Sequence, residues 1–186
     1  MLSRREVLLA PAAAAAFGAF GSRVTAAGGP VTLALHQNTS ARAGYRGSLE
    51  GWAKAGITQV ELTNSLLDRF LETDTLAGAK QVLADLRLTA VSGACGVVGL
   101  LEAGPERAAH VEAFKRRCGQ WTVLGIPLIY VTTQSTHKPV ADDYKPVPGF
   151  IHELGDIAKA HGLTVMFEAM RTSTFIATIT TMLALS

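Results

Sequence analysis

Several polar side chains of this chain stand at or just after the ends of short apolar runs, and their types suit a sugar or a metal ion. Glu168 follows the run 165–167, and His36 and Glu61 hold comparable places at two earlier runs. Carboxylates and an imidazole can accept hydrogen bonds from hydroxyl groups, ligate a divalent cation and carry protons. The sequence has no phosphate-cradling GxGxxG or GxxxxGK[ST] loop. We therefore expect sugar hydroxyls, or a metal with oxygen and nitrogen ligands.

Glu168 is the most informative of these residues. An unpaired carboxylate at the end of a buried strand is costly, and a divalent cation would offset its charge. A glutamate beside a carbonyl group can also move a proton. The simpler alternative is a structural salt bridge with Arg171. For Glu61 the alternative is a carboxylate bonded to backbone amides, and for His36 it is a hydrogen-bonded histidine at a strand end.

Five short apolar runs would position these side chains. Each run is partly β-branched, which is typical of a strand buried on both faces of a parallel sheet. The predicted strands are 31–35, 57–62, 88–92, 126–131 and 163–168. Successive strands begin about 25 to 40 residues apart, the length of one βα unit.

The segments between the strands have helical spacing. Ser48 can cap a helix over 49–55, with Gly56 as its left-handed end. Glu112 and Arg116 form an i,i+4 pair on another predicted helix. Apolar stripes predict the remaining helices at 76–86, 105–124, 151–160 and 175–183.

Five βα units fit two architectures. A doubly wound open sheet of the flavodoxin type is complete with five strands, whereas a (β/α)8 barrel needs eight units and about 250 residues. The chain ends on an apolar segment at 183–186, which favours the barrel. We therefore predict an α/β fold of the (β/α)8 TIM-barrel kind, truncated to about five βα units. In both architectures the chemistry lies at the carboxyl ends of the strands.

The composition indicates a globular domain and excludes several classes of protein. Of 186 residues, 48% are hydrophobic and 17% are charged, which excludes a disordered chain. The formal charge is +2, and without residues 1–26 it falls to zero, which argues against a nucleic-acid partner. Cys95 and Cys118 have no CxxC spacing, so we expect buried thiols, although export would permit their pairing.

Residues 1–26 have the order of an export signal. Arg4 and Arg5 precede an apolar run over 7–20, which is too short to span a bilayer, and small residues before Ala27 suit cleavage after Ala26. The segment 3–9 resembles the twin-arginine motif of proteins exported in the folded state. An ordinary secretory signal or an amphipathic helix is the alternative. We expect a mature domain of 27–186, periplasmic or secreted, with no membrane contact after cleavage.

The order of these segments resembles the xylose isomerase-like TIM-barrel family of sugar phosphate isomerases and epimerases. Three segments carry the resemblance, namely Leu33–Asn38, Leu49–Leu62 and His161–Arg171, and it covers residues 31–186. The ending Gly-Leu-strand-Glu-x-x-Arg, which closes at Arg171, is its most specific part.

The resemblance implies roles for individual residues. Glu168 matches the family's glutamate at the end of strand five, which binds a divalent metal (Mn, Mg, Co or Zn) and is one of two catalytic proton shuttles. Arg171 falls near a substrate-contacting position. His36, Asn38 and Glu61 fall in the pocket region, so we expect them to bind substrate.

The resemblance also implies a function, which is metal-assisted proton transfer on a small sugar or sugar phosphate. The family takes its other metal ligands from strands six to eight, which this sequence does not contain. A single carboxylate does not hold Mg²⁺ or Mn²⁺ with useful affinity. We therefore expect an inactive fragment of an isomerase or epimerase. The alternative is a non-catalytic periplasmic module that binds a small molecule on a five-strand open sheet.

Overall fold

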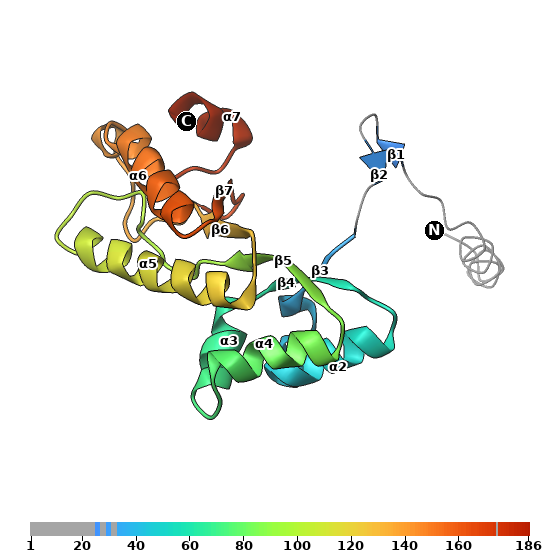
Figure 1. Ribbon diagram of the computed structural model, residues 1–186. Helices are drawn as coiled ribbons and strands as arrows, with labels where there is room; N and C mark the ends of the chain where they lie inside the picture. The colour runs from blue at the N-terminus through green and yellow to red at the C-terminus, as the bar shows by residue number, and fades with distance from the viewer. Residues whose placement is uncertain (1–24, 27–28, 31–32, 174) are drawn as a thin grey trace, which may run out of the picture. The chain divides into compact units, whose positions relative to one another are not determined.

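The computed structural model describes residues 25–26, 29–30, 33–173 and 175–186, and the chain divides into two units after Leu33 (Figure 1). In the first unit, strands β1 (Thr25–Ala26) and β2 (Gly29–Pro30) pair antiparallel. The predicted twin-arginine motif and its apolar run lie outside the described residues. Within the described ranges, no helix combines the length and hydropathy needed to cross a bilayer.

Five parallel strands form one sheet in the second unit. Their order across the sheet equals their order in the sequence. A doubly wound sheet reverses its strand order at a switch point, whereas a (β/α)8 barrel keeps it. The sequential order therefore confirms the partial-barrel prediction and contradicts the doubly wound alternative. The strands are β3 (Leu35–His36), β4 (Gln59–Leu62), β5 (Thr89–Ala94), β6 (Leu128–Thr132) and β7 (Thr164–Glu168).

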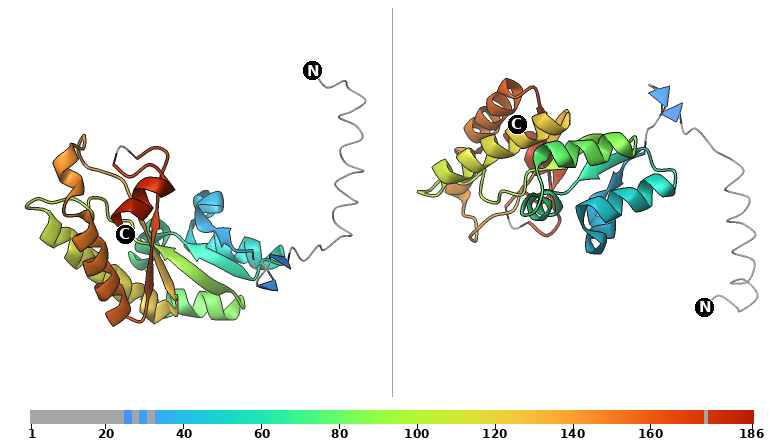
Figure 2. Two further views of the ribbon diagram at one scale, coloured as in Figure 1. Left: turned by 90° about the horizontal axis from the view of Figure 1, so that it is seen from above. Right: turned by 60° about the horizontal axis from the view of Figure 1, so that its bottom comes forward.

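Helices connect the strands, and α4, α5 and α6 follow one another along one face of the sheet (Figure 2). This arrangement is that of consecutive right-handed βα units. The bounds are η1 (Gln37–Ala43), α2 (Gly44–Lys54), α3 (Asn64–Leu71), α4 (Leu76–Asp85), α5 (Arg107–Leu124), η2 (Ala141–Tyr144), α6 (Val147–Ala160) and α7 (Ile179–Leu185).

Burial alternates along the central strands. Val60 and Leu62 of β4 are fully buried, whereas Glu61 between them is half-buried. In β6, Ile129 is fully buried and Tyr130 is half-buried. Because successive side chains of a strand point to opposite faces, the aliphatic residues pack under the helices and the polar ones lie on the other face. The prediction of two buried faces therefore holds for one face only.

The first helix begins earlier than predicted. Helix α2 starts at Gly44, so Ser48 lies inside the helix, where its hydroxyl donates to the Tyr45 carbonyl at 2.9 Å. The predicted N-cap role of Ser48 is therefore wrong. The left-handed glycine after this helix is confirmed, because Gly56 has a φ of 81°.

Three further local predictions differ from the structure. Helix α3 lies between β4 and α4, where the sequence pattern predicts none. Glu112 pairs with Lys115 at 2.7 Å and not with Arg116, because i,i+3 neighbours also meet on a helix. The last helix begins at Ile179, and Phe175 is instead buried in the loop before it.

The two cysteines behave as the sequence predicts. Cys95 and Cys118 are both free and both buried in the core between the sheet and α5. Burial raises the pKa of Cys95 to about 11 and that of Cys118 to about 12. Both thiols therefore stay protonated at neutral pH and act as small apolar side chains.

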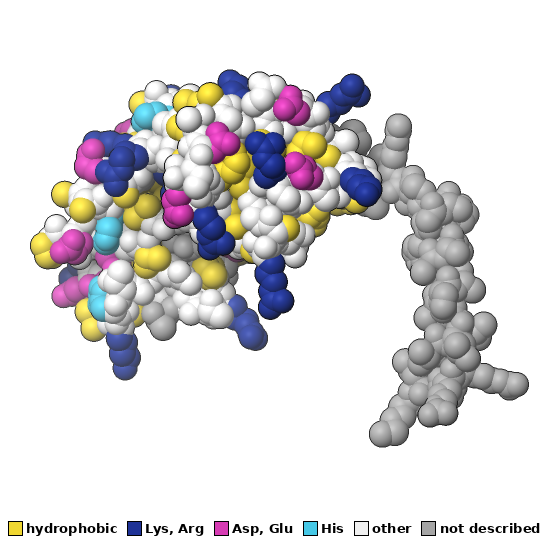
Figure 3. Space-filling model, turned by 90° about the horizontal axis from the view of Figure 1, so that it is seen from below, with side chains coloured by type: hydrophobic (Ala, Val, Ile, Leu, Met, Phe, Trp, Pro, Cys, Tyr) yellow, Lys and Arg dark blue, Asp and Glu magenta, His cyan; other side chains and the backbone are white. Residues whose placement is uncertain are grey.

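Charged side chains are interspersed on the face shown in Figure 3. Lys and Arg lie among Asp, Glu and apolar residues there and do not gather into one basic field. That distribution agrees with the near balance of 17 basic and 15 acidic residues in the whole sequence.

Candidate functional site

A cavity of about 370 Å³ lies on the half-buried face of the sheet, toward the carboxyl ends of the strands. Side chains from β3, β4, β6 and β7 meet in it. Such a position, at the carboxyl ends of parallel strands, is where α/β barrels place their chemistry. The cavity is lined by His36, Glu61, Tyr130, Met166, Phe167 and Glu168.

Strand register places three polar residues side by side next to this cavity. His36 of β3 pairs with Glu61 of β4, and Glu61 pairs with Ser92 of β5. Nε2 of His36 lies 3.4 Å from Oε1 of Glu61, and the Ser92 hydroxyl donates to Oε2 of Glu61. Glu61 is therefore held by side chains, and the alternative of a carboxylate bonded to backbone amides is wrong.

Tyr130 joins the same group from β6. Its hydroxyl oxygen lies 2.8 Å from Nε2 of His36, whose Nδ1 accepts a hydrogen bond from the backbone N–H of Asn38 at 3.1 Å. Burial, together with the charges of Glu61 and Glu168, raises the pKa of Tyr130 well above its usual value. Tyr130 therefore keeps its proton throughout the physiological pH range.

Sequence reasoning missed Tyr130 because it lies inside a strand and not after its end. The alternation of buried and half-buried side chains along β6 is the signal that could have found it. Ile129 and Val131 are fully buried under the helices, so the side chain between them must project from the opposite face.

Glu168 ends β7 and differs from Glu61 in having a free carboxylate. Its backbone carbonyl accepts hydrogen bonds from the N–H of Thr133 at 3.3 Å and from the Thr133 hydroxyl at 3.0 Å. Its side chain forms no hydrogen bond or ion pair within the described part of the chain, so the salt bridge with Arg171 is not present there. The backbone is thus fixed while the carboxylate stays available to a ligand.

The other two predicted site residues lie outside this cavity. Asn38 is exposed, and its contact with the site is through its backbone N–H, which donates to the His36 side chain that caps η1. Arg171 is exposed beyond the end of β7 and does not line the cavity. Gln37, also at the end of the first strand, is fully buried and bonds Ser48 at 3.0 Å, which makes it a structural residue.

The described residues do not form a complete metal site. Both ring nitrogens of His36 are engaged, and Glu61 is bonded to Ser92 and close to His36. Glu168 alone offers an uncommitted carboxylate, whereas divalent cations take several oxygen or nitrogen ligands. Accordingly, no cluster of three or more His, Cys, Asp or Glu side chains suited to a metal ion occurs within the described ranges.

Comparison with known proteins shows a similarity in fold. No family model matches the sequence, and no curated protein matches it. Among solved structures, the IolI protein with a bound zinc atom superposes with a TM-score of 0.70 at 18% identity, over 83% of this chain and 58% of that one. A xylose isomerase domain protein from Alicyclobacillus acidocaldarius gives a TM-score of 0.66 at 11% identity, over 82% of this chain and 57% of that one. The described part of this chain has the fold of a partial xylose isomerase-like TIM barrel.

A third solved structure with this xylose isomerase-like fold is a sugar epimerase. The D-allulose 3-epimerase from Methylomonas sp., in complex with D-allulose, gives a TM-score of 0.62 at 18% identity, over 82% of this chain and 56% of that one. The predicted resemblance is therefore confirmed in fold. The chain spans a little more than half the length of these three proteins, between 56% and 58%.

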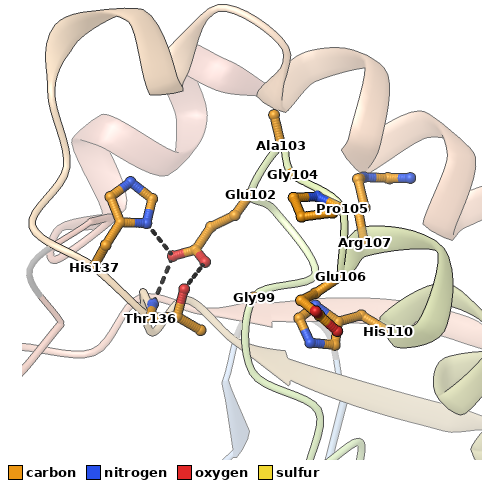
Figure 4. Close-up of a pocket in the computed structure, with 10 residues that line it drawn as sticks. All are labelled: Gly99, Glu102, Ala103, Gly104, Pro105, Glu106, Arg107, His110, Thr136 and His137. Carbon is orange, nitrogen blue, oxygen red and sulfur yellow. Dashed lines mark hydrogen bonds and ion pairs between the residues drawn. The ribbon is translucent and has the colours of Figure 1, made fainter.

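A second cavity, of about 250 Å³, lies between the loops that follow β5 and β6 (Figure 4). Glu102, 6% exposed, accepts hydrogen bonds from the N–H of Thr136 at 2.7 Å and from its hydroxyl. Nδ1 of His137 lies 3.7 Å from Glu102, and Nε2 lies 3.0 Å from Asp143 of η2. This loop cluster of Glu102, Thr136, His137 and Asp143 therefore ties three segments together.

Hydrogen bonds set the pKa values of the loop cluster. The hydrogen bond to Asp143 raises the pKa of His137. Burial by itself would raise the pKa of Glu102. Hydrogen bonds from Ser135 and Thr136, in the loop after β6, outweigh burial and leave that pKa lowered. A backbone N–H and the bond from His137 lower the pKa of Asp143.

We expect the loop cluster to stabilise the fold most between about pH 5 and pH 6. Because the pKa of His137 is raised, its contribution is present at low pH and is lost as the pH rises through the raised value. The carboxylates have lowered pKa values, so their contribution is lost as the pH falls through those values. His137→Gln should flatten the profile of the urea midpoint between about pH 5 and pH 8.

The effect should be small, because the His137 side chain is exposed and solvent screens its charge. His152→Gln is the matched control, since His152 is exposed on α6 and outside the loop cluster. Superimposable profiles for the wild type and His137→Gln would contradict this assignment.

Proposed function

We propose that the cavity of His36, Glu61, Tyr130 and Glu168 binds a small sugar that carries a carbonyl group, and that Glu168 moves a proton beside that carbonyl. A free carboxylate that shares one cavity with three hydrogen-bonding side chains is the observation that supports this function. The similar epimerase solved with D-allulose supports the substrate class. A phosphorylated sugar is a second member of that class.

The proposed step is general base catalysis at carbon. Glu168 takes the proton from the carbon next to the carbonyl, the electrons of the broken C–H bond form a C=C bond, and the carbonyl electrons move to oxygen. Return of a proton from water to the same carbon on its other face gives an epimer. Return of the proton to the former carbonyl carbon, while the proton of the neighbouring hydroxyl moves to the former carbonyl oxygen, gives an isomer. Glu61 can accept a hydrogen bond from a sugar hydroxyl.

We assign no step to a metal ion, because the described residues that line the cavity provide one free carboxylate. Glu168 would be the ligand that this chain contributes to a divalent ion such as Mn, Mg, Co or Zn. Further ligands would have to come from outside the described residues. Arg171, three residues after Glu168 in the sequence, is a further proposed substrate contact, although it does not line the cavity.

Hydrogen exchange on a ketohexose tests this proposal. The full chain is incubated with D-allulose in D₂O, and the proton on the carbon next to the carbonyl is followed by NMR. Loss of that proton signal, faster than without protein, is the expected result, and it would contradict the expectation from the sequence that this chain is an inactive fragment. Binding of D-allulose without exchange would instead support the alternative of a non-catalytic binding module. If D-allulose neither binds nor exchanges its proton, that result would contradict both functions.

We also propose that the chain is exported through the twin-arginine route and acts in the periplasm or outside the cell. The support is the sequence of residues 3–9. Exported protein should begin at Ala27, as N-terminal sequencing would show. Replacing Arg4 and Arg5 together with Lys should retain the precursor in the cytoplasm, whereas Arg23→Lys should not. Export of the double variant at the wild-type level would contradict this route.

A further inference from the structure

The hydrogen bonds around His36 fix which ring nitrogen carries the proton. The backbone N–H of Asn38 points at Nδ1 at 3.1 Å, and a backbone N–H can only donate. Nδ1 must therefore be the unprotonated nitrogen of a neutral ring, and the ring proton sits on Nε2. The His36 side chain is also the N-cap of η1, so this arrangement is built into the local fold.

The direction of the next hydrogen bond follows from this tautomer. Nε2 of His36 lies 2.8 Å from the Tyr130 hydroxyl oxygen, and it has a proton to give and no free lone pair. Tyr130 is therefore the acceptor in this bond. Its own hydroxyl proton is not used by His36, and the Tyr130 hydroxyl forms no other hydrogen bond in the described part of the chain.

The surroundings of Tyr130 direct this spare proton to a ligand. The Tyr130 side chain lines the cavity together with Glu61 and Glu168. Glu61 already accepts from Ser92 and lies close to His36. A ligand oxygen in the cavity is therefore a partner that satisfies the donor, and a buried donor without a partner is costly.

We infer that Tyr130 donates a hydrogen bond to the carbonyl oxygen of the sugar while Glu168 removes the proton from the adjacent carbon. Negative charge develops on that oxygen as the C–H bond breaks, and a preorganised donor stabilises it in the transition state. His36 acts as a positioning residue, because its Nε2–H holds the Tyr130 oxygen and turns the hydroxyl proton away from the ring. The identity of the ligand rests on the proposed function, whereas the direction of the hydrogen bonds does not.

The direction of the hydrogen bonds is measured in the protein without any sugar. Long-range proton–nitrogen correlation NMR on the full chain labelled at histidine distinguishes the two neutral tautomers. The His36 signals are assigned by their loss in His36→Asn, in which the shorter side chain can still cap η1. We expect the Nε2–H tautomer, and we expect Tyr130→Phe to shift the Nε2 resonance without changing the tautomer. An Nδ1–H tautomer would overturn the inference whether or not sugar binds.

The role of the donor is measured by exchange on D-allulose in D₂O. Tyr130→Phe should slow exchange about 100-fold, the usual effect of removing one oxyanion donor. Tyr144→Phe is the matched control, because the Tyr144 hydroxyl donates to the Phe175 carbonyl at 2.7 Å, away from the cavity. That variant should exchange at the wild-type rate.

A double variant tests the positioning role of His36. If His36 acts only through Tyr130, then adding His36→Asn to Tyr130→Phe should slow exchange no further. Additive losses would assign His36 its own contact with the sugar and overturn its role as a positioning residue.

Two outcomes separate this inference from the proposed function. Wild-type exchange that is unchanged in Tyr130→Phe would overturn the inference and leave the proposed function standing. If the wild type neither binds D-allulose nor exchanges its proton, the proposed function fails, and the substrate contact of Tyr130 fails with it.

Discussion

Glu168→Gln should slow hydrogen exchange on D-allulose at least 100-fold while leaving the fold intact. Glutamine has nearly the same shape as glutamate but cannot take a proton, so the general base is lost. The Glu168 carboxylate is exposed and bonds no other described side chain, so its replacement breaks no contact of the folded protein. The exchange rate is read by NMR in D₂O and the stability by the urea midpoint.

A matched variant separates loss of the base from loss of negative charge. Glu50→Gln removes one exposed carboxylate from α2 and should leave the exchange rate unchanged. Exchange at the wild-type rate in Glu168→Gln would show that another group takes the proton. A large drop in the urea midpoint of Glu168→Gln would show that the carboxylate is structural.

The sheet could be predicted from the sequence because the signals for its strands are local. Each predicted strand overlaps an observed one, since a run of β-branched and aliphatic residues after a helix end indicates a strand without knowledge of its neighbours. Gly56 ended the first long helix as expected, because a left-handed residue favours glycine. The same reasoning placed Glu61 and Glu168 toward the carboxyl ends of their strands.

The candidate site could be predicted only in part, because its contacts join distant parts of the sequence. The His36–Tyr130 bond links residues 94 positions apart, and the bond from Ser92 to Glu61 depends on a strand register shifted between Val60 and Glu61. A single sequence carries no direct signal for such a register.

The local sequence context was misleading for two polar residues. Ser48 has the sequence context of a helix cap, yet it lies inside α2, where the Gln37 amide donates to its hydroxyl in the core. Arg171 stands near Glu168 in the sequence, yet the described structure forms no ion pair between them. Local spacing cannot report a tertiary hydrogen bond that overrides it.

Gly93→Ala should destabilise the protein by roughly 3 kcal/mol, which a fall in the urea midpoint would measure. A Cβ at this position of β5 would lie 2.6 Å from Cε2 and 2.8 Å from Cδ2 of the Trp121 ring. That ring is fully buried on α5, and its Nε1–H donates to the Ala94 carbonyl at 3.2 Å. The ring therefore cannot move aside without losing both its packing and its hydrogen bond.

Gly51→Ala is the control, and its effect should have the opposite sign. Gly51 lies within α2, and a Cβ there would meet no atom within 4 Å. Replacing a helical glycine with alanine stabilises a helix by about 0.5 to 1 kcal/mol. An unchanged urea midpoint for Gly93→Ala would contradict the close packing of α5 on β5. That packing also holds Ser92 next to Glu61, so we expect Gly93→Ala to weaken the candidate site together with the fold.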